Sequence, residues 1–291
     1  MTVISASYKT DIPAFYGDWF QRQLTQKFVE TKNPFNNKKS IISLAPEDVD
    51  AYVFWTRNAD PFLPVLHNAI ANQHPFYFQF TVTAYPRLIE TSVISSEDSI
   101  SQMTSIANNF GPHAVVWRYD PIFVSDLTPL NFHLENFTKL ARQLEHVVNE
   151  VVVSFTQPYA KTKRNLARLE QKTPINFQNP PNEIKQSFLM ELQKIAASSG
   201  IRMTLCTQPN QMTERLTGAA CIDKNRIAAI GGENIDPKLQ GNREGCLCIA
   251  SRDIGMYDTC AHGCVYCYAV GSAKKAKAAL KTYKRGLAIN S

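Results

Sequence analysis

The sequence lacks the features that mark several protein classes. No apolar run approaches the roughly 18 residues that a membrane-spanning helix needs. The opening residues, MTVISASYKTDIP, carry neither the basic nor the apolar segment of a secretory signal peptide. A P-loop, a GxGxxG motif and a nucleophile elbow are also absent from the sequence. We therefore expect a cytoplasmic protein with no membrane partner.

Acidic residues are missing from positions 272–291, which carry six of the 31 basic residues. The remaining 25 basic residues balance the 25 acidic ones, so the net charge of +6 lies in this tail. A basic helical face could follow the phosphates of a nucleic acid or nucleotide. The alternative is a solvated outer helix face with Ala276, Leu280 and Tyr283 turned inward.

Short β-rich runs alternate with helical patterns along most of the chain, which predicts a parallel α/β sheet. At 291 residues, right-handed crossovers would curl this sheet into a partial or full TIM-like barrel, with a doubly wound open sheet as the alternative. We expect one barrel domain over 1–291, with a cysteine-rich cluster-binding part over 206–268. The strand-like runs are VISASY (3–8), DAYVFWT (50–56), FYFQFTVT (76–83), AVVWRYD (114–120), EVVVSFT (150–156) and IRMTLCT (201–207).

Polar residues follow or close these strands, where a barrel would carry its active site. For any single one of them, a helix cap or a loop hydrogen bond is the alternative. Arg118 and Asp120 share a strand face because they are two residues apart, so an internal ion pair competes with substrate contact. Trp117 and Tyr119 face the other way. The catalytic candidates are Lys9, Asp11, Arg118 and Asp120, and the candidates for cofactor binding at the strand ends are Thr56, Thr81 and Ser154.

Seven cysteines in a chain without an export signal should stay reduced, and their grouping indicates metal or redox chemistry. The stretch DIGMYDTCAHGCVYCYAV places Cys260, Cys264 and Cys267 in a C-x3-C-x2-C pattern, between a strand near 248–254 and a basic helix beginning near Tyr268. Three thiolates can bind three irons of a [4Fe-4S] cluster and leave the fourth iron open to an external ligand. A structural zinc site needs four ligands, and His262 inside the loop could complete a Cys3His set.

The C-x3-C-x2-C loop with Tyr266 before its third cysteine resembles the signature of radical SAM enzymes. The resemblance implies a [4Fe-4S] cluster whose open iron chelates S-adenosylmethionine (SAM), and reductive cleavage to a 5′-deoxyadenosyl radical. It also implies a flavodoxin- or ferredoxin-type electron donor, and gives Tyr266 a place in the cofactor site. The superfamily carries this loop after its first strand, so its position here implies a circular permutation in which the last βα unit lies beside strand 3–8. Ser5, Ser7 and Lys9 would then lie near the methionyl group of SAM.

The whole chain is also similar to an uncharacterised bacterial family with a C-terminal radical-SAM-like cysteine cluster. WRYDPI is similar to the spore photoproduct lyase group of DNA-repair enzymes. The resemblance gives no substrate, and we favour nucleic acid or nucleotide over a small metabolite or a peptide. The stretches that carry the family resemblance, over nearly 1–270, are SASYKTDIPAFYGDWF, DVDAYVFWTRN, FQFTVTAY, WRYDPI and DIGMYDTCAHGCVYCYA.

Four further cysteines, Cys206, Cys221, Cys246 and Cys248, equal the number that a fully ligated second [4Fe-4S] cluster or a zinc site needs. The alternative is that Cys206 and Cys221 are buried apolar residues. The second functional hypothesis is a non-catalytic, zinc-stabilised protein that binds nucleic acid through its basic tail.

Overall fold

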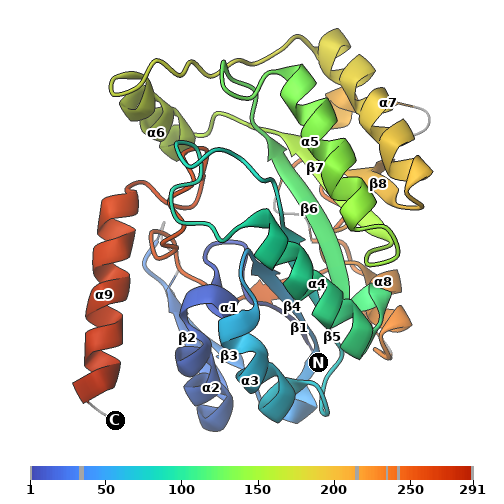
Figure 1. Ribbon diagram of the computed structural model, residues 1–291. Helices are drawn as coiled ribbons and strands as arrows, with labels where there is room; N and C mark the ends of the chain where they lie inside the picture. The colour runs from blue at the N-terminus through green and yellow to red at the C-terminus, as the bar shows by residue number, and fades with distance from the viewer. Residues whose placement is uncertain (1, 33–35, 214–215, 234, 241–242, 290–291) are drawn as a thin grey trace.

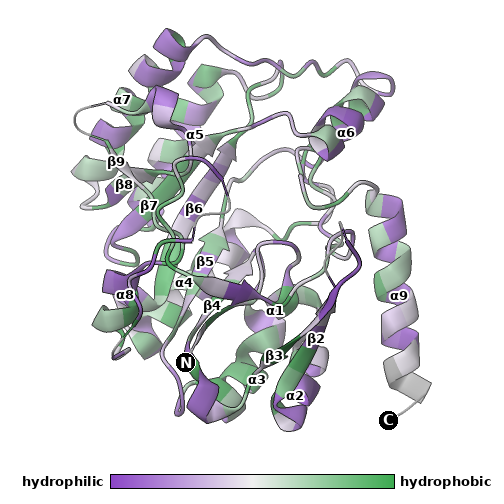
Figure 2. Ribbon diagram, turned by 180° about the vertical axis from the view of Figure 1, so that it is seen from behind, coloured by the Kyte–Doolittle hydropathy of each residue, from purple (hydrophilic) through white to green (hydrophobic). Residues whose placement is uncertain are grey.

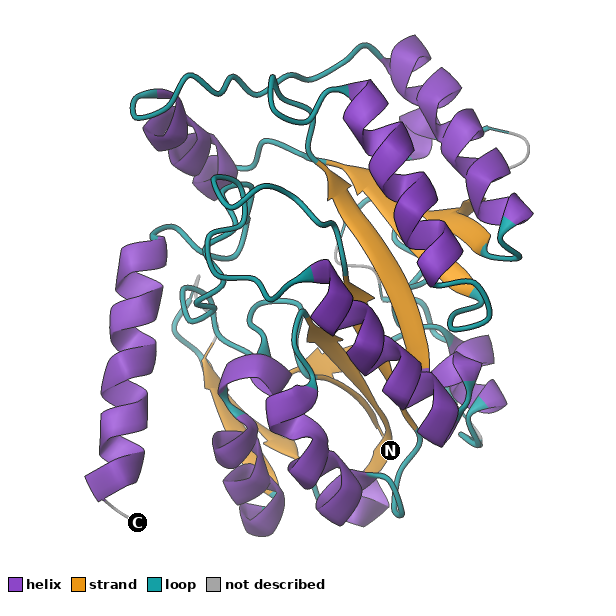
Figure 3. Cartoon of the chain, in the orientation of Figure 1, coloured by secondary structure: helices purple, strands orange, loops and turns teal. Residues whose placement is uncertain are grey.

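The structure is a computed structural model that describes residues 2–32, 36–213, 216–233, 235–240 and 243–289. Within these residues the chain forms an eight-stranded parallel sheet in the order β10-β1-β4-β5-β6-β7-β8-β9 (Figures 1 and 3). The predicted α/β class with a parallel sheet is confirmed. The strands are β1 (Thr2–Ser5), β4 (Val49–Thr56), β5 (Phe76–Thr81), β6 (Val115–Ile122), β7 (Glu150–Phe155), β8 (Arg202–Leu205), β9 (Thr217–Gly218) and β10 (Ser251–Asp253).

The strands from β1 to β9 follow chain order, as they do in a TIM-like sheet, without the reversal of order that a doubly wound sheet has. The edge strands β9 and β10 do not pair with each other in the described residues, so barrel closure is not formed there. A separate hairpin, β2 (Phe28–Lys32) with β3 (Lys39–Ser43), was not predicted. No helix in the described residues is long and apolar enough to cross a membrane.

Each face of the sheet packs against a different part of the chain. Tyr52 and Phe54 of β4 point into a core shared with helices α1–α7, while Val53 between them points to the opposite face. That opposite face is covered by residues of the 219–249 segment, including Ile227 of α8. Figure 1 shows α4 and α5 in front of the sheet, and Figure 2 shows the molecule from behind. The helices are α1 (Ile12–Phe15), α2 (Gly17–Gln26), α3 (Leu63–Val65), α4 (Ser96–Phe110), α5 (Leu130–Gln143), α6 (Ala160–Glu170), α7 (Asn182–Ser198), α8 (Lys224–Ala229) and α9 (Ala273–Ile289).

The basic tail helix, α9, lies at the edge of the molecule in both views (Figures 1 and 2). The prediction that it begins near Tyr268 is wrong, because it begins at Ala273. The carbonyl groups just before it accept hydrogen bonds from α6: Asn165 Nδ2 donates to Val270 O (2.9 Å) and Arg168 Nη1 donates to Gly271 O (2.7 Å). These contacts hold the preceding segment in an extended loop.

The inward face of α9 agrees with the prediction for two of its residues. Ala276 is fully buried, and the Tyr283 ring lies 5.1 Å from that of Tyr16. Lys274, Lys275 and Lys277 are exposed. The helix therefore packs on the body through a narrow apolar stripe and presents most of its charge to solvent.

Candidate metal centre

The three-cysteine loop leaves the sheet at the carboxyl end of β10, which pairs in parallel with β1 through Ser5 and Asp253. The expected place of the terminal unit beside the first strand is confirmed. Because the carboxyl ends of parallel strands share one edge of the sheet, the loop joins the polar residues that follow β1 and β4. The motif at the end of the chain thus meets the residues at its beginning.

The thiols of Cys260, Cys264 and Cys267 are half-buried in this loop. Burial raises the pKa of Cys260 well above its usual value, and negative charge on Cys267, Asp11 and Cys264 adds to the effect. Burial likewise raises the pKa of Cys264 to about 12. The three sulfurs therefore lie close enough to affect one another electrostatically. Among the described residues, however, no three His, Cys, Asp or Glu side chains stand ready to hold a metal ion.

A buried network centred on Arg57 lies against the loop. Its Nη1 is 2.9 Å from Glu90 Oε1, and its Nη2 donates to the hydroxyl of Tyr266 at 2.5 Å. The Tyr266 hydroxyl in turn donates to Glu90. Burial lowers the pKa of Arg57, but negative charge on Glu90, with smaller contributions from Tyr266 and two cysteines of the loop, outweighs burial and raises the pKa well above its usual value. Arg57 therefore stays cationic, and its charge lowers the pKa of Cys264 and Cys267, against the larger raising effect of burial.

Sequence reasoning missed the roles of Arg57 and Glu90. Arg57 follows strand β4 directly, which was a usable signal, whereas Glu90 stands in a loop with no pattern to single it out. Both line a polar cavity of about 200 Å³, and the cofactor candidate Thr81 lines it too. Thr81 therefore lies beside the Arg57 network rather than beside the cysteines.

Asp11 joins three parts of the site. Its carboxylate accepts hydrogen bonds from Thr56 Oγ1, the Arg57 backbone N–H and His262 Nε2, each at 2.8 Å. It also caps α1 through the N–H of Ala14. The other ring nitrogen of His262 lies 3.4 Å from Ser92 O, so both nitrogens of His262 have protein partners. In this arrangement Asp11 and Thr56 position the loop, and His262 has no free nitrogen for a metal ion.

Residues at the end of β1 and just after it gather around Asp253, which sequence reasoning also missed. Ser5 Oγ donates to Asp253 Oδ2 at 2.8 Å, Ser7 Oγ donates to Oδ1 at 2.9 Å, and Lys9 Nζ lies 3.3 Å from Oδ1. Both serines are buried. The structure thus brings three predicted residues together on a carboxylate of the neighbouring strand, and their contact with SAM stays a prediction.

Arg118 and Asp120 form the internal ion pair that the sequence left open as an alternative to substrate contact. Ser154 Oγ donates to the same carboxylate. Arg118 Nη1 also donates to Gln79 Oε1 at 3.1 Å and to the sulfur of Cys221 at 3.0 Å. These three predicted residues therefore lie together beside the second set of cysteines rather than beside the C-x3-C-x2-C loop.

That second set is drawn together from three segments. The sulfurs of Cys206 and Cys221 are 3.8 Å apart. Hydrogen bonding to Cys206 lowers the pKa of Cys221, but hydrogen bonding to Cys248 and burial outweigh it and raise the pKa to about 11. Cys248 has Cys221 and Cys246 as its thiol neighbours, and its pKa is also raised to about 11. The thiols are therefore neighbours in the spatial order Cys206, Cys221, Cys248 and Cys246.

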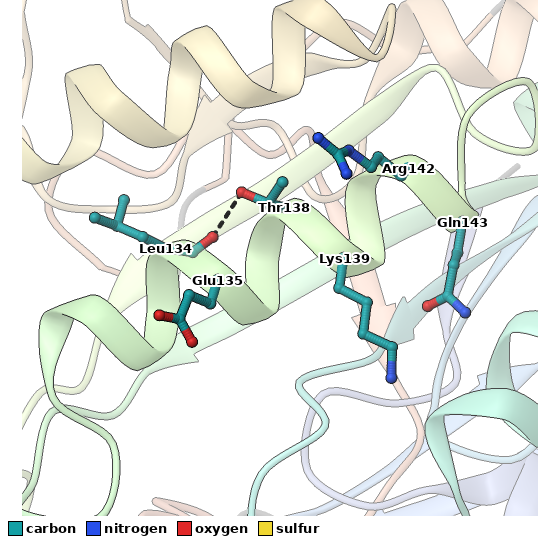
Figure 4. A pocket seen from close by; sticks show the side chains of 6 residues that line it. All are labelled: Leu134, Glu135, Thr138, Lys139, Arg142 and Gln143. Carbon is teal, nitrogen blue, oxygen red and sulfur yellow. Dashed lines mark hydrogen bonds between the residues drawn. The ribbon is translucent and has the colours of Figure 1, made fainter.

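A second hollow on the surface belongs to neither set of cysteines. It lies along the outer side of α5, and the residues that line it all come from that one helix (Figure 4). Arg142 and Lys139 there are exposed to solvent. None of the residues that line this hollow lies at the end of a strand, so the hollow is not part of the candidate site. The lining residues are Leu134, Glu135, Thr138, Lys139, Arg142 and Gln143.

The fold and the site define an α/β protein whose parallel sheet carries a three-cysteine loop at the carboxyl end of its last strand. The chain belongs to the family described as Domain of unknown function (DUF1848), whose model matches residues 3–269. The match covers the sheet from Val3 onward, the second set of cysteines and the whole C-x3-C-x2-C loop. No curated protein matches this chain. The resemblance to an uncharacterised family is confirmed, and an affiliation with radical SAM enzymes belongs to the proposal that follows.

Proposed function

We propose that this protein is a radical SAM enzyme that holds a [4Fe-4S] cluster through Cys260, Cys264 and Cys267. The observation that carries the proposal is the position of the C-x3-C-x2-C loop at the carboxyl edge of the sheet, beside β1, with its three thiols close enough for charge on one to raise the pKa of another. Because His262 Nε2 bonds to Asp11 and its Nδ1 lies 3.4 Å from Ser92 O, the loop offers three ligands rather than four. Three ligands suit a cluster with one open iron, whereas a structural zinc ion needs a fourth.

When bound, the cluster and SAM supply a 5′-deoxyadenosyl radical by one-electron reductive cleavage, with a flavodoxin- or ferredoxin-type protein as the electron donor. Burial raises the pKa values of the loop thiols and keeps them protonated at neutral pH, so binding of the cluster must release protons. The cation of Arg57 offsets part of the negative charge that the bound thiolates carry.

The polar side chains around Asp253 suit the methionyl group of SAM. Asp253 offers a hydrogen-bond acceptor to the amino group of SAM, and Lys9 offers a countercharge to its carboxylate. The Tyr268 hydroxyl, which donates to Tyr8 O at 2.6 Å, is close enough to both Cys267 and Asp253 for their charges to raise its pKa, after the larger effect of burial. Lys9, Asp253 and the loop therefore share one side of the site.

The substrate class rests on α9. Its exposed lysines stand on the helix that follows the loop, so they could hold the backbone of a nucleic acid while a base enters the site. We propose nucleic acid or nucleotide as the substrate on this charge placement.

The test is production of 5′-deoxyadenosine from SAM under dithionite by anaerobically purified protein. Cys260→Ala, Cys264→Ala and Cys267→Ala should each abolish it, because losing one thiolate opens a second iron and destabilises the cluster. Met256→Ala is the matched control, since Met256 is exposed in the same loop, and it should retain full production. Retained production in any cysteine variant would contradict the proposal. Zinc without iron or visible absorbance in the native protein would favour the zinc-stabilised binding protein instead.

A further inference from the structure

The second set of cysteines joins segments that the strands leave apart. Cys206 directly follows β8 and Cys221 follows β9, at one edge of the sheet. Cys246 and Cys248 precede β10, at the other edge. Cys221 and Cys248 are buried against Val53, Val116 and other residues of the sheet face, and Cys206 and Cys246 are half-buried. The four thiols therefore meet where the sheet is open between β9 and β10.

The spacing of the sulfurs distinguishes two kinds of metal site. Four thiolates that lie about 2.3 Å from one tetrahedral ion are about 3.8 Å from one another. The sulfurs of Cys206 and Cys221 are 3.8 Å apart. In a [4Fe-4S] cluster each thiolate binds a different iron, so the sulfurs lie farther apart than around a single ion. The observed pair has the separation that a single ion requires.

Two hydrogen-bond donors also point at sulfur in this set. Arg118 Nη1 lies 3.0 Å from the sulfur of Cys221, and the backbone N–H of Ile222 donates to the sulfur of Cys248 at 3.4 Å. A thiol sulfur accepts hydrogen bonds weakly, whereas a thiolate bound to a metal commonly has such partners around it. Arg118 is buried, so its cation would offset part of the negative charge of four thiolates around a divalent ion. Both donors favour ligated thiolates over apolar core residues.

We propose that Cys206, Cys221, Cys246 and Cys248 bind a single tetrahedral zinc ion that ties the two open edges of the sheet together. The four sulfurs follow one another as neighbours rather than forming a closed tetrahedron. Side-chain rotation at the half-buried Cys206 and Cys246 brings the four sulfurs together around the ion. The proposal is independent of the C-x3-C-x2-C loop and of the proposed radical chemistry.

The zinc ion has a structural task in this position. The segment from Cys221 to Cys248 covers one face of the sheet and contains α8 as its one regular helix in the described residues. Just before this segment begins, the backbone N–H of Ala219 donates to Leu205 O of β8 at 2.8 Å. One ion bound by cysteines from both ends of the segment removes loop entropy from the unfolded chain and adds its binding free energy to folding.

The test uses the full chain with Cys260, Cys264 and Cys267 all replaced by alanine, so that a cluster in that loop cannot contribute metal. We expect about one zinc ion per chain with no iron and no sulfide, and zinc absorption spectra with about four sulfur neighbours at about 2.3 Å and no second metal nearby. Adding Cys246→Ala, a change at a half-buried position, should release the zinc and lower the melting temperature while far-ultraviolet circular dichroism is kept. Adding Met256→Ala instead should change neither zinc content nor melting temperature.

Three results would overturn the proposal. About four irons with sulfide in the triple variant would make the site a second cluster. One iron without sulfide would keep the single-ion geometry but refute zinc as its metal. Absence of any metal, with a melting temperature that Cys246→Ala leaves unchanged, would return the four cysteines to the core. Loss of the radical chemistry in the native protein would leave all of these measurements unaffected.

Discussion

Replacing Arg57 by methionine tests the network that supports the cysteine loop. The side chain of Arg57 is 9% exposed and that of Glu90 is 3% exposed, and their closest atoms are 2.9 Å apart. Methionine has a similar length but no charge, so the variant leaves Glu90 as a buried carboxylate that keeps Thr83 and Tyr266 as hydrogen-bond partners. We expect a large loss of stability, because the cost arises from the carboxylate left behind.

The magnitude follows from the burial of the pair. Removing one partner of a buried ion pair costs about 3 to 5 kcal/mol. With an unfolding entropy of about 2.1 cal/mol/K per residue, a chain of 291 residues should melt about 5 to 8 °C lower. The double variant Arg57→Met/Glu90→Gln removes both charges and should recover much of this loss, so the coupling between the two sites should reach about 2 kcal/mol.

Thermal unfolding of the metal-free protein gives the four melting temperatures of this cycle, and iron content after reconstitution gives a second measurement. Arg57→Met should also load less iron, since its cation no longer offsets the charge of Cys264 and Cys267. Arg57→Lys is the matched control that keeps the charge but cannot bond both partners in the fork geometry of a guanidinium. Strictly additive effects of Arg57→Met and Glu90→Gln would refute the pairing.

Three further predictions address the body, the loop and the tail. Burial lowers the pKa of His133 from 6.5 to about 4, so as pH falls the imidazole is protonated in the unfolded chain before it is protonated in the folded one. The free energy of unfolding should therefore fall by about 3 kcal/mol between pH 6.5 and pH 4, and urea titrations of His133→Gln should lose this pH dependence. Gly263 has φ +74° and a Cβ would collide with Thr91 Oγ1, so Gly263→Ala should reduce iron loading while Gly286→Ala, which meets nothing, should not. Replacing four lysines of α9 by Gln should weaken nucleic-acid binding. It should also reduce the slope of log binding constant against log salt by about 0.7 to 0.9 for each phosphate that the variant no longer neutralises. Equal binding by the native protein and the variant would refute a polymer substrate. The four lysines are Lys274, Lys275, Lys277 and Lys281.

The strands and long helices were readable from the sequence because local signals mark them. Helix α4 is marked at both ends, since Ser95 accepts from the Asp98 N–H at its start and Gly111, with φ +87°, ends it. The β2–β3 hairpin was missed because three of the five residues in each of its strands are exposed, which weakens the apolar pattern. Local patterning therefore predicted the sheet but not this appendage.

The site was harder to predict because its partners are distant in sequence. Glu90 gains its role only from Arg57 and Tyr266, and Asp253 gains its role from residues of β1 and the segment after it. No periodicity or spacing connects such positions. The cysteines were found because three of them stand within eight residues, whereas the carboxylates that support the site stand singly.

The position of the cysteine loop at the end of the chain is compatible with the proposed chemistry because the sheet, not the chain order, decides which groups meet. β10 extends the sheet on the outer side of β1, so the loop after it joins the turn after β1. Side chains from the first segment then hold the loop directly: Tyr16 Oη donates to Thr259 O at 2.8 Å, and Asp11 accepts from His262. A site built from both ends of the chain forms only when the sheet is complete. Metal loading should therefore follow folding of the whole sheet rather than precede it.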